Sequence, residues 1–218
     1  MSIENYILLG PPGSGKSTQA ELLSAGLGLR HIDIGSALRA AAEEDTPFGH
    51  MVNATINKRR ELVSDDIVKA VLEKALKNIQ APQGILLDGA PRRASQIDKV
   101  TEALRSVGRT ISWVIFIDLS EEESIERISK RYLCLSCHKP YIFGKDIFST
   151  EAVCDACGGK IGQRTDDTPA GVRKRFQIFQ AETLPVADYF EKAKTLLRVD
   201  GHQDAQAIYQ DIIRQKGR

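Results

Sequence analysis

The chain of 218 residues is long enough for one large domain, alone or with small insertions, that buries a hydrophobic core without disulfide staples. Hydrophobic residues make up 42% and charged residues 27%, and the net charge of +1 argues against a nucleic-acid-binding or membrane-binding surface. The apolar runs are too short to span a bilayer and the first residues show no signal-peptide pattern, so we expect a cytoplasmic protein.

Short β-type runs alternate with helix-like stretches along the whole chain. The runs are residues 6–9, 31–34, 84–88, 113–119 and 196–200. Strands that alternate with helices predict an α/β fold, in which helices cover a parallel sheet. Helix starts are predicted where a capping side chain precedes an acidic residue or a proline. Four such positions are Thr46, Ser64, Ser120 and Thr168, of which Ser120 has capping-box spacing to Glu123.

The most specific motif follows the first run directly. Residues 10–18 read Gly-Pro-Pro-Gly-Ser-Gly-Lys-Ser-Thr and match the phosphate-binding pattern GxxxxGK[ST]. Gly10, Gly13 and Gly15 permit the tight turns that aim backbone N–H groups at a phosphate, and Lys16 adds a positive charge. The helix expected to open near Gly15 directs its positive dipole end at the same place. We therefore predict that this loop binds a polyphosphate.

A carboxylate ends the third β-type run. Asp88 follows three apolar residues and precedes Gly89, at the strand end where open α/β sheets bind ligands. Because the chain also carries a phosphate-binding loop, Asp88 is a candidate to meet magnesium, directly or through water. An apolar strand that ends in an ordinary Asp-Gly turn is the alternative.

Arginines near the ends of predicted elements form a second group of candidates. They are Arg39, Arg92, Arg127, Arg131, Arg164 and Arg175. Arg127 and Arg131 are four residues apart and are predicted to share a face of the helix that starts after Ser120, where like charges repel unless an anion lies between them. Guanidinium groups suit phosphoryl oxygens both in binding and during transfer. The alternative is that Glu123 pairs with Arg127 and the face is solvated.

Residues 132–165 lack sustained periodicity and read as a separate small insert. The insert contains all four cysteines, Cys134, Cys137, Cys154 and Cys157. Two C-x2-C pairs with sixteen residues between them predict one tetrahedral metal ion, with zinc favoured. Four thiolates leave no open coordination position, so the metal is predicted to be structural. An iron–sulfur centre, a pair of redox dithiols and His138 in place of one thiolate stay open as alternatives.

Together these pieces resemble the adenylate kinase family, in the long form whose lid carries a metal-binding insert, over essentially the whole chain. The matching pieces are residues 10–20 (GPPGSGKSTQA), 34–39 (IGSALR), 62–65 (LVSD), 87–92 (LDGAPR), 127–131, the four cysteines, and 163–167 (QRTDD) with Arg175. The resemblance implies a P-loop kinase core with a five-stranded parallel sheet covered by helices, a monophosphate-binding insert and a zinc-binding lid. The implied boundaries are 1–32, 64–131 and 167–218 for the core, 33–63 for the insert and 132–166 for the lid.

The same resemblance implies reversible phosphoryl transfer from ATP, with magnesium, to AMP, giving two ADP. The residues expected to bind ATP and magnesium are Gly10, Gly13, Ser14, Gly15, Lys16, Ser17, Thr18, Asp88 and Arg127. Those expected to bind the acceptor or the phosphates between the substrates are Gly35, Arg39, Val63, Gly89, Arg92, Gln96, Arg164 and Arg175. Those expected to act in the transfer are Lys16, Arg92, Arg127, Arg131, Arg164 and Arg175. A structural zinc is expected on the four cysteines.

Gln96 favours AMP as the acceptor, because relatives that act on pyrimidine monophosphates tend to carry asparagine at its position. Ile34, Ser36 and Ala90 depart from the threonine, acidic residue and phenylalanine that the family usually has, and they leave acceptor specificity open. We expect a monomer that acts on small molecules, without a nucleic-acid or membrane partner. The alternatives are a P-loop kinase for another nucleoside monophosphate or small acceptor, and a zinc-ribbon ATPase that binds nucleic acid.

Overall fold

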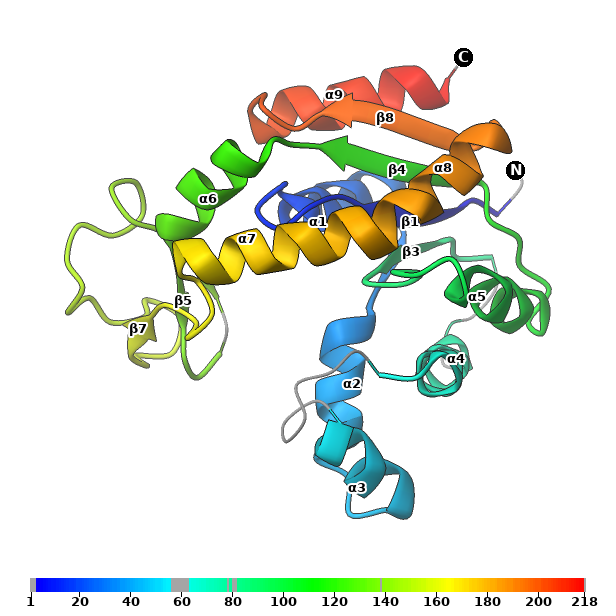
Figure 1. Cartoon of the computed structure of the whole chain (residues 1–218), viewed down its shortest axis with the longest axis horizontal. Coiled ribbons are helices and arrows are strands. Elements are labelled where there is room, and N and C mark those ends of the chain that lie inside the picture. Colours follow the sequence, from blue (N-terminus) through cyan, green and yellow to red (C-terminus); the bar gives the residue numbers. More distant parts are fainter. Residues whose placement is uncertain (1–2, 56–62, 78, 80–81, 138, 218) are drawn as a thin grey trace.

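A parallel sheet of five strands, in the order β2-β3-β1-β4-β8, forms the centre of the protein (Figure 1). The computed structural model describes residues 3–55, 63–77, 79, 82–137 and 139–217. The strands of the sheet are β1 (Asn5–Leu9), β2 (Arg30–Asp33), β3 (Ile85–Asp88), β4 (Trp113–Asp118) and β8 (Leu196–Asp200). All five predicted runs are strands of one parallel sheet, which confirms the predicted fold class.

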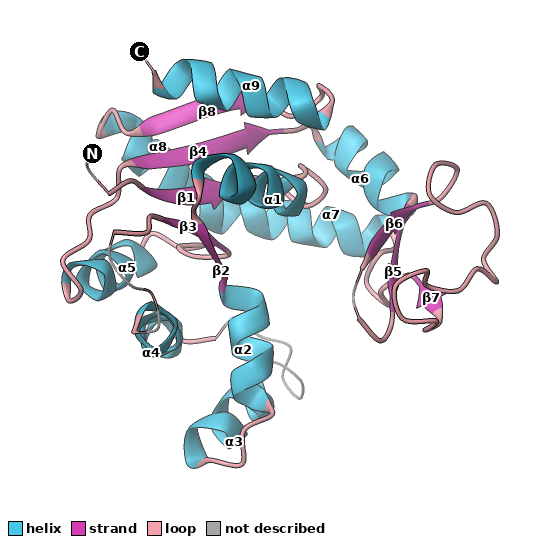
Figure 2. Ribbon diagram, turned by 180° about the vertical axis from the view of Figure 1, so that it is seen from behind, coloured by secondary structure: helices cyan, strands magenta, loops and turns pink. Residues whose placement is uncertain are grey.

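Helices connect the strands and cover the sheet (Figure 2). They are α1 (Lys16–Leu27), α2 (Ile34–Ala42), α3 (Pro47–Asn53), α4 (Asp65–Leu76), α5 (Gln96–Arg105), α6 (Glu121–Ser129), α7 (Pro169–Ile178), the π-helical turn η2 (Phe179–Thr183), α8 (Leu184–Lys192) and α9 (Ala205–Lys216). The four predicted caps are confirmed, because each capping hydroxyl accepts the N–H of the residue three positions later. Within the described parts of the chain, no helix has both the length and the hydropathy needed to cross a lipid bilayer.

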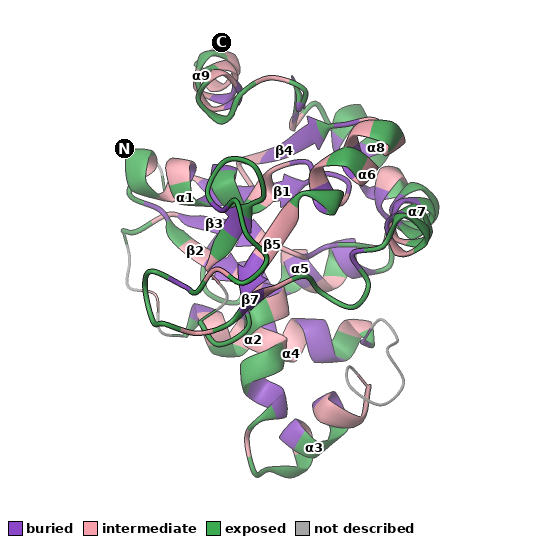
Figure 3. Ribbon diagram, turned by 90° about the vertical axis from the view of Figure 1, so that its left-hand side faces the viewer, coloured by how far each residue is buried: buried purple, intermediate pink, exposed green. Residues whose placement is uncertain are grey.

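Alternation along β1 divides the core into two layers. Tyr6 and Leu8 belong to the hydrophobic cluster that includes residues of α1 and α9. Ile7 and Leu9 belong to the cluster on the other face, with residues of α2, α4, α5 and α8. Successive side chains of a strand point to opposite faces, so a strand that is apolar at every position is buried on both sides. In Figure 3, β1, β3 and β4 are coloured mostly as buried, and the helices around them are partly exposed.

Two segments extend away from the sheet (Figures 1 and 2). One consists of α2 and α3, which follow β2, and residues 56–62 after it lie outside the described part of the chain. The other follows α6 and precedes α7, and it holds a second sheet of three antiparallel strands in the order β6-β5-β7. Its strands are β5 (Arg131–Cys134), β6 (Pro140–Ile142) and β7 (Ile161–Gly162). Strands of two to four residues are too short to give a periodic sequence pattern.

Candidate functional site

The loop between β1 and α1 forms a backbone cradle at the carboxyl edge of the sheet. Gly10, Gly13 and Gly15 have φ angles of 154°, 77° and 90°. A Cβ atom on Gly10 would lie 2.6 Å from Ser14 Oγ and 2.7 Å from the Ile117 carbonyl oxygen, so only glycine fits there. Gly15 is the N-cap of α1 and has no side chain to cap it, which leaves the N–H groups of the first turn for an anionic ligand.

Lys16 lies inside this cradle. Its Nζ atom donates to the carbonyl oxygens of Gly10 and Pro11, both at 2.8 Å, and lies 3.4 Å from Ser14 Oγ. These carbonyls hold the ammonium group at the centre of the loop. A phosphate surrounded by the same loop would meet a full positive charge there.

The charge environment of Lys16 identifies its neighbours. Burial lowers the pKa of Lys16 to about 8, the charge of Asp88 opposes this shift, and the charges of Arg92 and Arg131 add to it. Burial in turn raises the pKa of Asp88, and the charge of Lys16 opposes that shift. Four predicted site residues from separate segments therefore lie close enough to influence one another.

Ser124 is a residue of the site that sequence reasoning missed. Its side chain is buried on α6 and its hydroxyl donates to the Pro12 carbonyl oxygen at 2.6 Å. This bond ties the phosphate-binding loop to α6, the helix that also carries Arg127. A single serine inside a helix matches no motif, so no sequence signal marks it.

Two glycines bring together the residues predicted to bind the acceptor. A Cβ atom on Gly35 would lie 3.5 Å from Arg39 Nη1, and one on Gly89 would lie 3.6 Å from Arg92 Nη2. The same position on Gly89 lies 3.6 Å from the backbone nitrogen of Gly35. The guanidinium groups of Arg39 and Arg92 thus lie against the backbone of two glycines that are themselves adjacent.

Asp33, a second missed residue, lies beside this pair. It ends β2 in register with Asp88, and its Oδ1 atom accepts the Gly35 N–H at 2.8 Å as the N-cap of α2. Its carboxylate also bonds to the Ser36 hydroxyl, which accepts from Arg39 Nη2 at 2.7 Å. Asp33 therefore helps to orient Arg39. The sequence shows only a helix-capping aspartate, and this pattern does not reveal that its carboxylate also orients an arginine.

Two further residues predicted to bind the acceptor are buried and contact Arg92 or Arg93. Gln96 is 3% exposed and its Oε1 atom accepts the Arg92 N–H at 2.7 Å. Val63 is 7% exposed and its carbonyl oxygen accepts from Arg93 Nη2 at 2.7 Å. In this structure both groups therefore hold the segment that carries Arg92.

Ile34 and Ala90, two of the departures from the resembled family, are core residues. They are 1% and 0% exposed and belong to the same hydrophobic cluster. An ideal Cβ atom on Gly89 lies 3.6 Å from the Ile34 Cβ atom, which places Ile34 next to the segment that carries Arg92.

The prediction that Arg127 and Arg131 share a helix face is wrong. Helix α6 ends at Ser129, and Arg131 is the first residue of β5. Its pairing with Ile142 in the small sheet replaces continuation of the helix. Arg127 stays on α6 with its Nε atom 2.7 Å from Glu123 Oε1, which confirms the alternative pairing.

Asp167 joins two of the predicted arginines. Its side chain is 0% exposed, and its carboxylate accepts from Arg131 Nη2 at 2.6 Å and from Arg175 Nη2 at 2.8 Å. Arg164 lies nearby, because burial and then the charge of Arg131 lower its pKa. Asp167 was missed as a site residue, since no sequence signal separates it from the adjacent Asp166.

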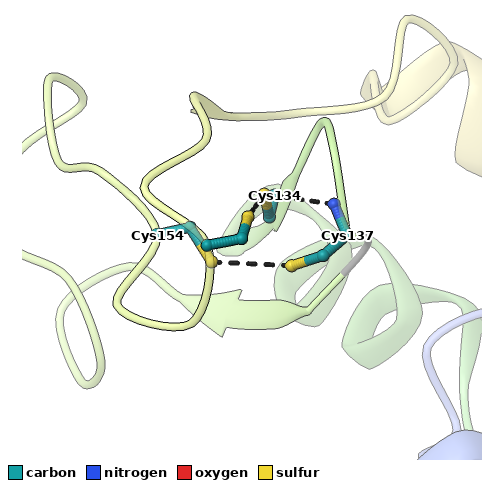
Figure 4. Close-up of side chains that lie close together, drawn as sticks. Cys134, Cys137 and Cys154 are labelled. Carbon is teal, nitrogen blue, oxygen red and sulfur yellow. Dashed lines mark hydrogen bonds between the residues drawn. The ribbon is translucent and has the colours of Figure 1, made fainter.

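The four cysteine sulfurs form a cluster on the small sheet (Figure 4). All four Sγ atoms lie within 4.8 Å of one another, with Cys134 to Cys157 at 3.4 Å and Cys137 to Cys154 at 3.6 Å. A tetrahedral zinc ion with bonds of about 2.3 Å needs sulfurs roughly 3.8 Å apart. The donor set and its spacing fit such an ion, and His138 lies outside the described residues.

Tyr141 of β6 also contacts this cluster. Its hydroxyl donates to Cys154 Sγ at 3.1 Å, and this bond is the largest of the influences that lower the pKa of Cys154 to about 6. A thiolate favoured in this way is the form that binds metal.

The predicted site residues thus fall into two groups. The charges of Asp88, Arg92 and Arg131 act on Lys16 of the phosphate-binding loop, and Gly35 and Gly89 place Arg39 near Arg92. Arg175 is joined to Arg131 through Asp167, and the charge of Arg131 acts on Arg164. Ser17 and Thr18 are exposed on the first turn of α1. The cysteines form a separate group on the small sheet.

Comparisons with known proteins agree with this geometry. A family model described as Adenylate kinase matches residues 8–195. A protein of Kosmotoga olearia named Adenylate kinase is 38% identical over 210 residues, which cover 96% of this chain and 97% of the relative. Proteins with the same name from Novosphingobium aromaticivorans and Bacillus subtilis are 39% and 35% identical, and each alignment covers 94% or 95% of both chains.

Proposed function

The chain belongs to the adenylate kinase family, and on this premise we propose that it transfers the terminal phosphoryl group of ATP, with magnesium, reversibly to AMP and yields two ADP. The enzyme is a nucleoside monophosphate kinase, a phosphotransferase of the adenylate kinase type. The observation that carries the proposal is that Lys16 of the phosphate-binding loop lies within range of the charges of Asp88, Arg92 and Arg131, which all influence its pKa. One phosphate-binding loop and arginines from separate segments suit a site for two phosphorylated substrates.

In this proposal the loop binds the donor. The N–H groups of Gly13 and Gly15 and the charge of Lys16 hold the β- and γ-phosphates, with Ser14, Ser17 and Thr18 on the same loop and first turn. Magnesium bound with ATP supplies charge neutralisation and orientation of the phosphate oxygens. Asp88 would hold that ion through water, and Thr18 or Ser17 would face it. Arg127 would lie against the donor from α6.

The acceptor would bind between α2 and the segment after β3. Arg39 and Arg92 hold its phosphate, supported by the convergence of the two guanidinium groups at Gly35 and Gly89. Gln96 and Val63 would contact the base. The bond from the Arg92 N–H to Gln96 couples the position of the base-binding amide to that of the phosphate-binding arginine.

Transfer needs no covalent nucleophile, because positioning and charge stabilisation suffice for a phosphoryl group. Lys16 and Arg92 would hold the two phosphates in line. Arg131, Arg164 and Arg175 would spread the negative charge that the transferring group carries. We propose that the segment with the cysteines and the segment with α2 and α3 close over the substrates, which keeps water from accepting the phosphoryl group.

The reaction is tested by a coupled assay of ADP formation with ATP, magnesium and each nucleoside monophosphate in turn. We expect AMP to raise ADP production far above the rate with ATP alone. Pyrimidine monophosphates are expected to be poor acceptors, because a site that hydrogen-bonds one base leaves buried polar groups unpaired with another. If no monophosphate raises the rate above the ATP-only control, the proposed kinase activity is wrong. If another monophosphate is preferred to AMP, the proposed acceptor is wrong and that monophosphate takes its place.

We further propose the boundaries 1–32, 64–131 and 167–218 for the core, 33–63 for the monophosphate-binding insert and 132–166 for the lid. A structural zinc ion on the four cysteines would hold the lid together, supported by the sulfur spacing and by the small apolar cluster around Tyr141 and Ile161. We also propose a cytoplasmic monomer that acts on small molecules. The near-neutral net charge supports the part of this proposal that excludes a nucleic-acid partner.

Zinc removal is expected to lower thermal stability. The purified protein should contain one equivalent of zinc. A zinc-selective chelator should lower the melting temperature by about 5 °C or more, which corresponds to a loss of roughly 2 kcal/mol in the free energy of unfolding for a chain of this size. Metal analysis and circular dichroism melts measure the two quantities, and re-addition of zinc is the control. Iron in place of zinc, or melting that the chelator leaves unchanged, would contradict the assignment.

A further inference from the structure

Tyr141 connects the two cysteine pairs of the small sheet. It lies on β6, which pairs with β5 next to the first pair, and its ring is 6% exposed. Its hydroxyl reaches across to the second pair and donates to Cys154 Sγ at 3.1 Å. Cys154 is itself buried, with 2% exposure. This hydrogen bond therefore links β6 to the segment with the second cysteine pair. A bound metal would also connect the two cysteine pairs.

The hydroxyl of Tyr141 has a second acceptor. It also contacts the carboxylate of Asp155, and its oxygen accepts the Asp155 N–H at 3.3 Å. A phenol carries one hydrogen, so it can donate fully to only one of the two acceptors. The position of that hydrogen decides whether Tyr141 supports the sulfur or the carboxylate.

The surroundings favour donation to the sulfur once a metal is bound. Asp155 has another partner, because Lys139 Nζ lies 2.8 Å and 2.6 Å from its two oxygens. Its side chain is also 67% exposed, so water can solvate it. The thiolate of Cys154 is buried and has little water, and a donor next to a buried charge contributes more than one next to an exposed charge.

We propose that Tyr141 is a positioning residue of the zinc site, whose hydroxyl donates to the Cys154 thiolate and strengthens the binding of a thiolate-preferring divalent cation. Lys139 assists by holding Asp155, which leaves the phenol hydrogen for the sulfur. The inference rests on the proposed structural zinc. Partners of this kind orient metal ligands and change metal affinity by about 10- to 100-fold.

The test compares Tyr141→Phe with Tyr132→Phe, a matched control. Tyr132 is the register partner of Tyr141 on β5 and packs on Phe143 with 5.7 Å between ring centroids, so both variants lose one hydroxyl from the same sheet. Zinc affinity is measured by competition with a chromogenic chelator. We expect Tyr141→Phe to weaken it by about tenfold. Tyr132→Phe should bind zinc as the unmodified protein does.

Cobalt substitution supplies a second reading that does not depend on activity. Co²⁺ bound to thiolates gives a sulfur-to-metal charge-transfer band, and loss of a hydrogen bond to one sulfur should shift that band in Tyr141→Phe and leave it in place in Tyr132→Phe. Unchanged affinity together with an unmoved band would overturn the role of Tyr141. Failure of the unmodified protein to bind either metal would instead overturn the proposed zinc site.

Asp155→Asn separates the two acceptors. This change weakens the competing acceptor at nearly constant size, so zinc affinity should rise in the original background. That rise should vanish when Tyr141→Phe is also present, because no hydroxyl is left to redirect. If Asp155→Asn weakens zinc binding as much as Tyr141→Phe does, the hydroxyl acts through the carboxylate and the proposed donation to sulfur is wrong.

Discussion

Replacing Lys16 by methionine is expected to lower kcat/KM for ADP formation by about 10³-fold, because the loop loses the one full charge at its centre. Methionine keeps the length of the side chain and nothing of its charge. The coupled assay with ATP, magnesium and AMP measures the loss. The melting temperature should change by only a few degrees, because the loss of the hydrogen bonds to Gly10 and Pro11 is offset by removal of a charge that burial disfavours.

The melting temperature is the control that separates the two explanations of a lost rate. Activity near the original value in a folded Lys16→Met protein would contradict the role of Lys16 in holding the transferring phosphates. A lost rate together with a large fall in melting temperature would instead point to damage to the loop.

The same lysine predicts a pH dependence. Its pKa of about 8 means that the free enzyme carries the charge below pH 8 and loses it as the pH rises through that value. Bound phosphates favour the charged form, so the KM for ATP should rise above pH 8, by up to tenfold per pH unit. The KM for AMP should stay level over the same range, because the guanidinium group does not deprotonate in proteins and the proposed ligands of the AMP phosphate are arginines. A flat KM for ATP up to pH 9.5 would contradict this expectation.

Replacing Asp167 by asparagine is expected to destabilise the protein by about 3 kcal/mol, because Arg131 and Arg175 would keep their charges without the buried carboxylate between them. In a chain of this size the melting temperature should fall by about 6–12 °C. The kcat should also fall, by about tenfold, because the two guanidinium groups lose the partner that orients them. Circular dichroism melts and the coupled assay measure these effects.

Asp166→Asn is the matched control. Asp166 is the adjacent residue, its side chain is 56% exposed, and its contact with Arg175 Nη1 is 3.3 Å long. Exposed pairs of this kind contribute about 1 kcal/mol or less, so its melting temperature should change little. If both variants lose the same melting temperature and activity, the arginines are held by nearby negative charge in general, and not by the buried hydrogen bonds to Asp167.

The central fold could be predicted because its signals are local. Strands β1, β3 and β4 are short, mostly apolar runs, and each of the four predicted caps is a hydroxyl three residues before the N–H that it accepts. The small sheet could not be predicted from its own residues, because β5, β6 and β7 have too few positions for any period. The spacing of the cysteines identified that segment as a metal-binding insert instead.

The one wrong structural prediction shows where local signals fail. Arg127 and Arg131 have helical spacing, and nothing in the residues between them ends a helix. The helix stops at Ser129 because the backbone of Arg131 pairs with Ile142 in the small sheet. This pairing depends on a residue eleven positions further along the chain. A helix prediction from the periodicity of a few turns does not take that residue into account.

The kinds of chemistry open to this protein could be inferred from residue types and their spacing alone. The phosphate-binding loop, the arginines and the four cysteines are patterns whose expected roles follow from charge, backbone freedom and donor chemistry. Which of these groups lie in contact became visible only in the folded chain. Asp167 between Arg131 and Arg175, and Tyr141 on Cys154, are contacts across many residues of sequence. These contacts depend on how the elements pack against one another. The type of a residue does not reveal which distant residue will contact it in the folded chain.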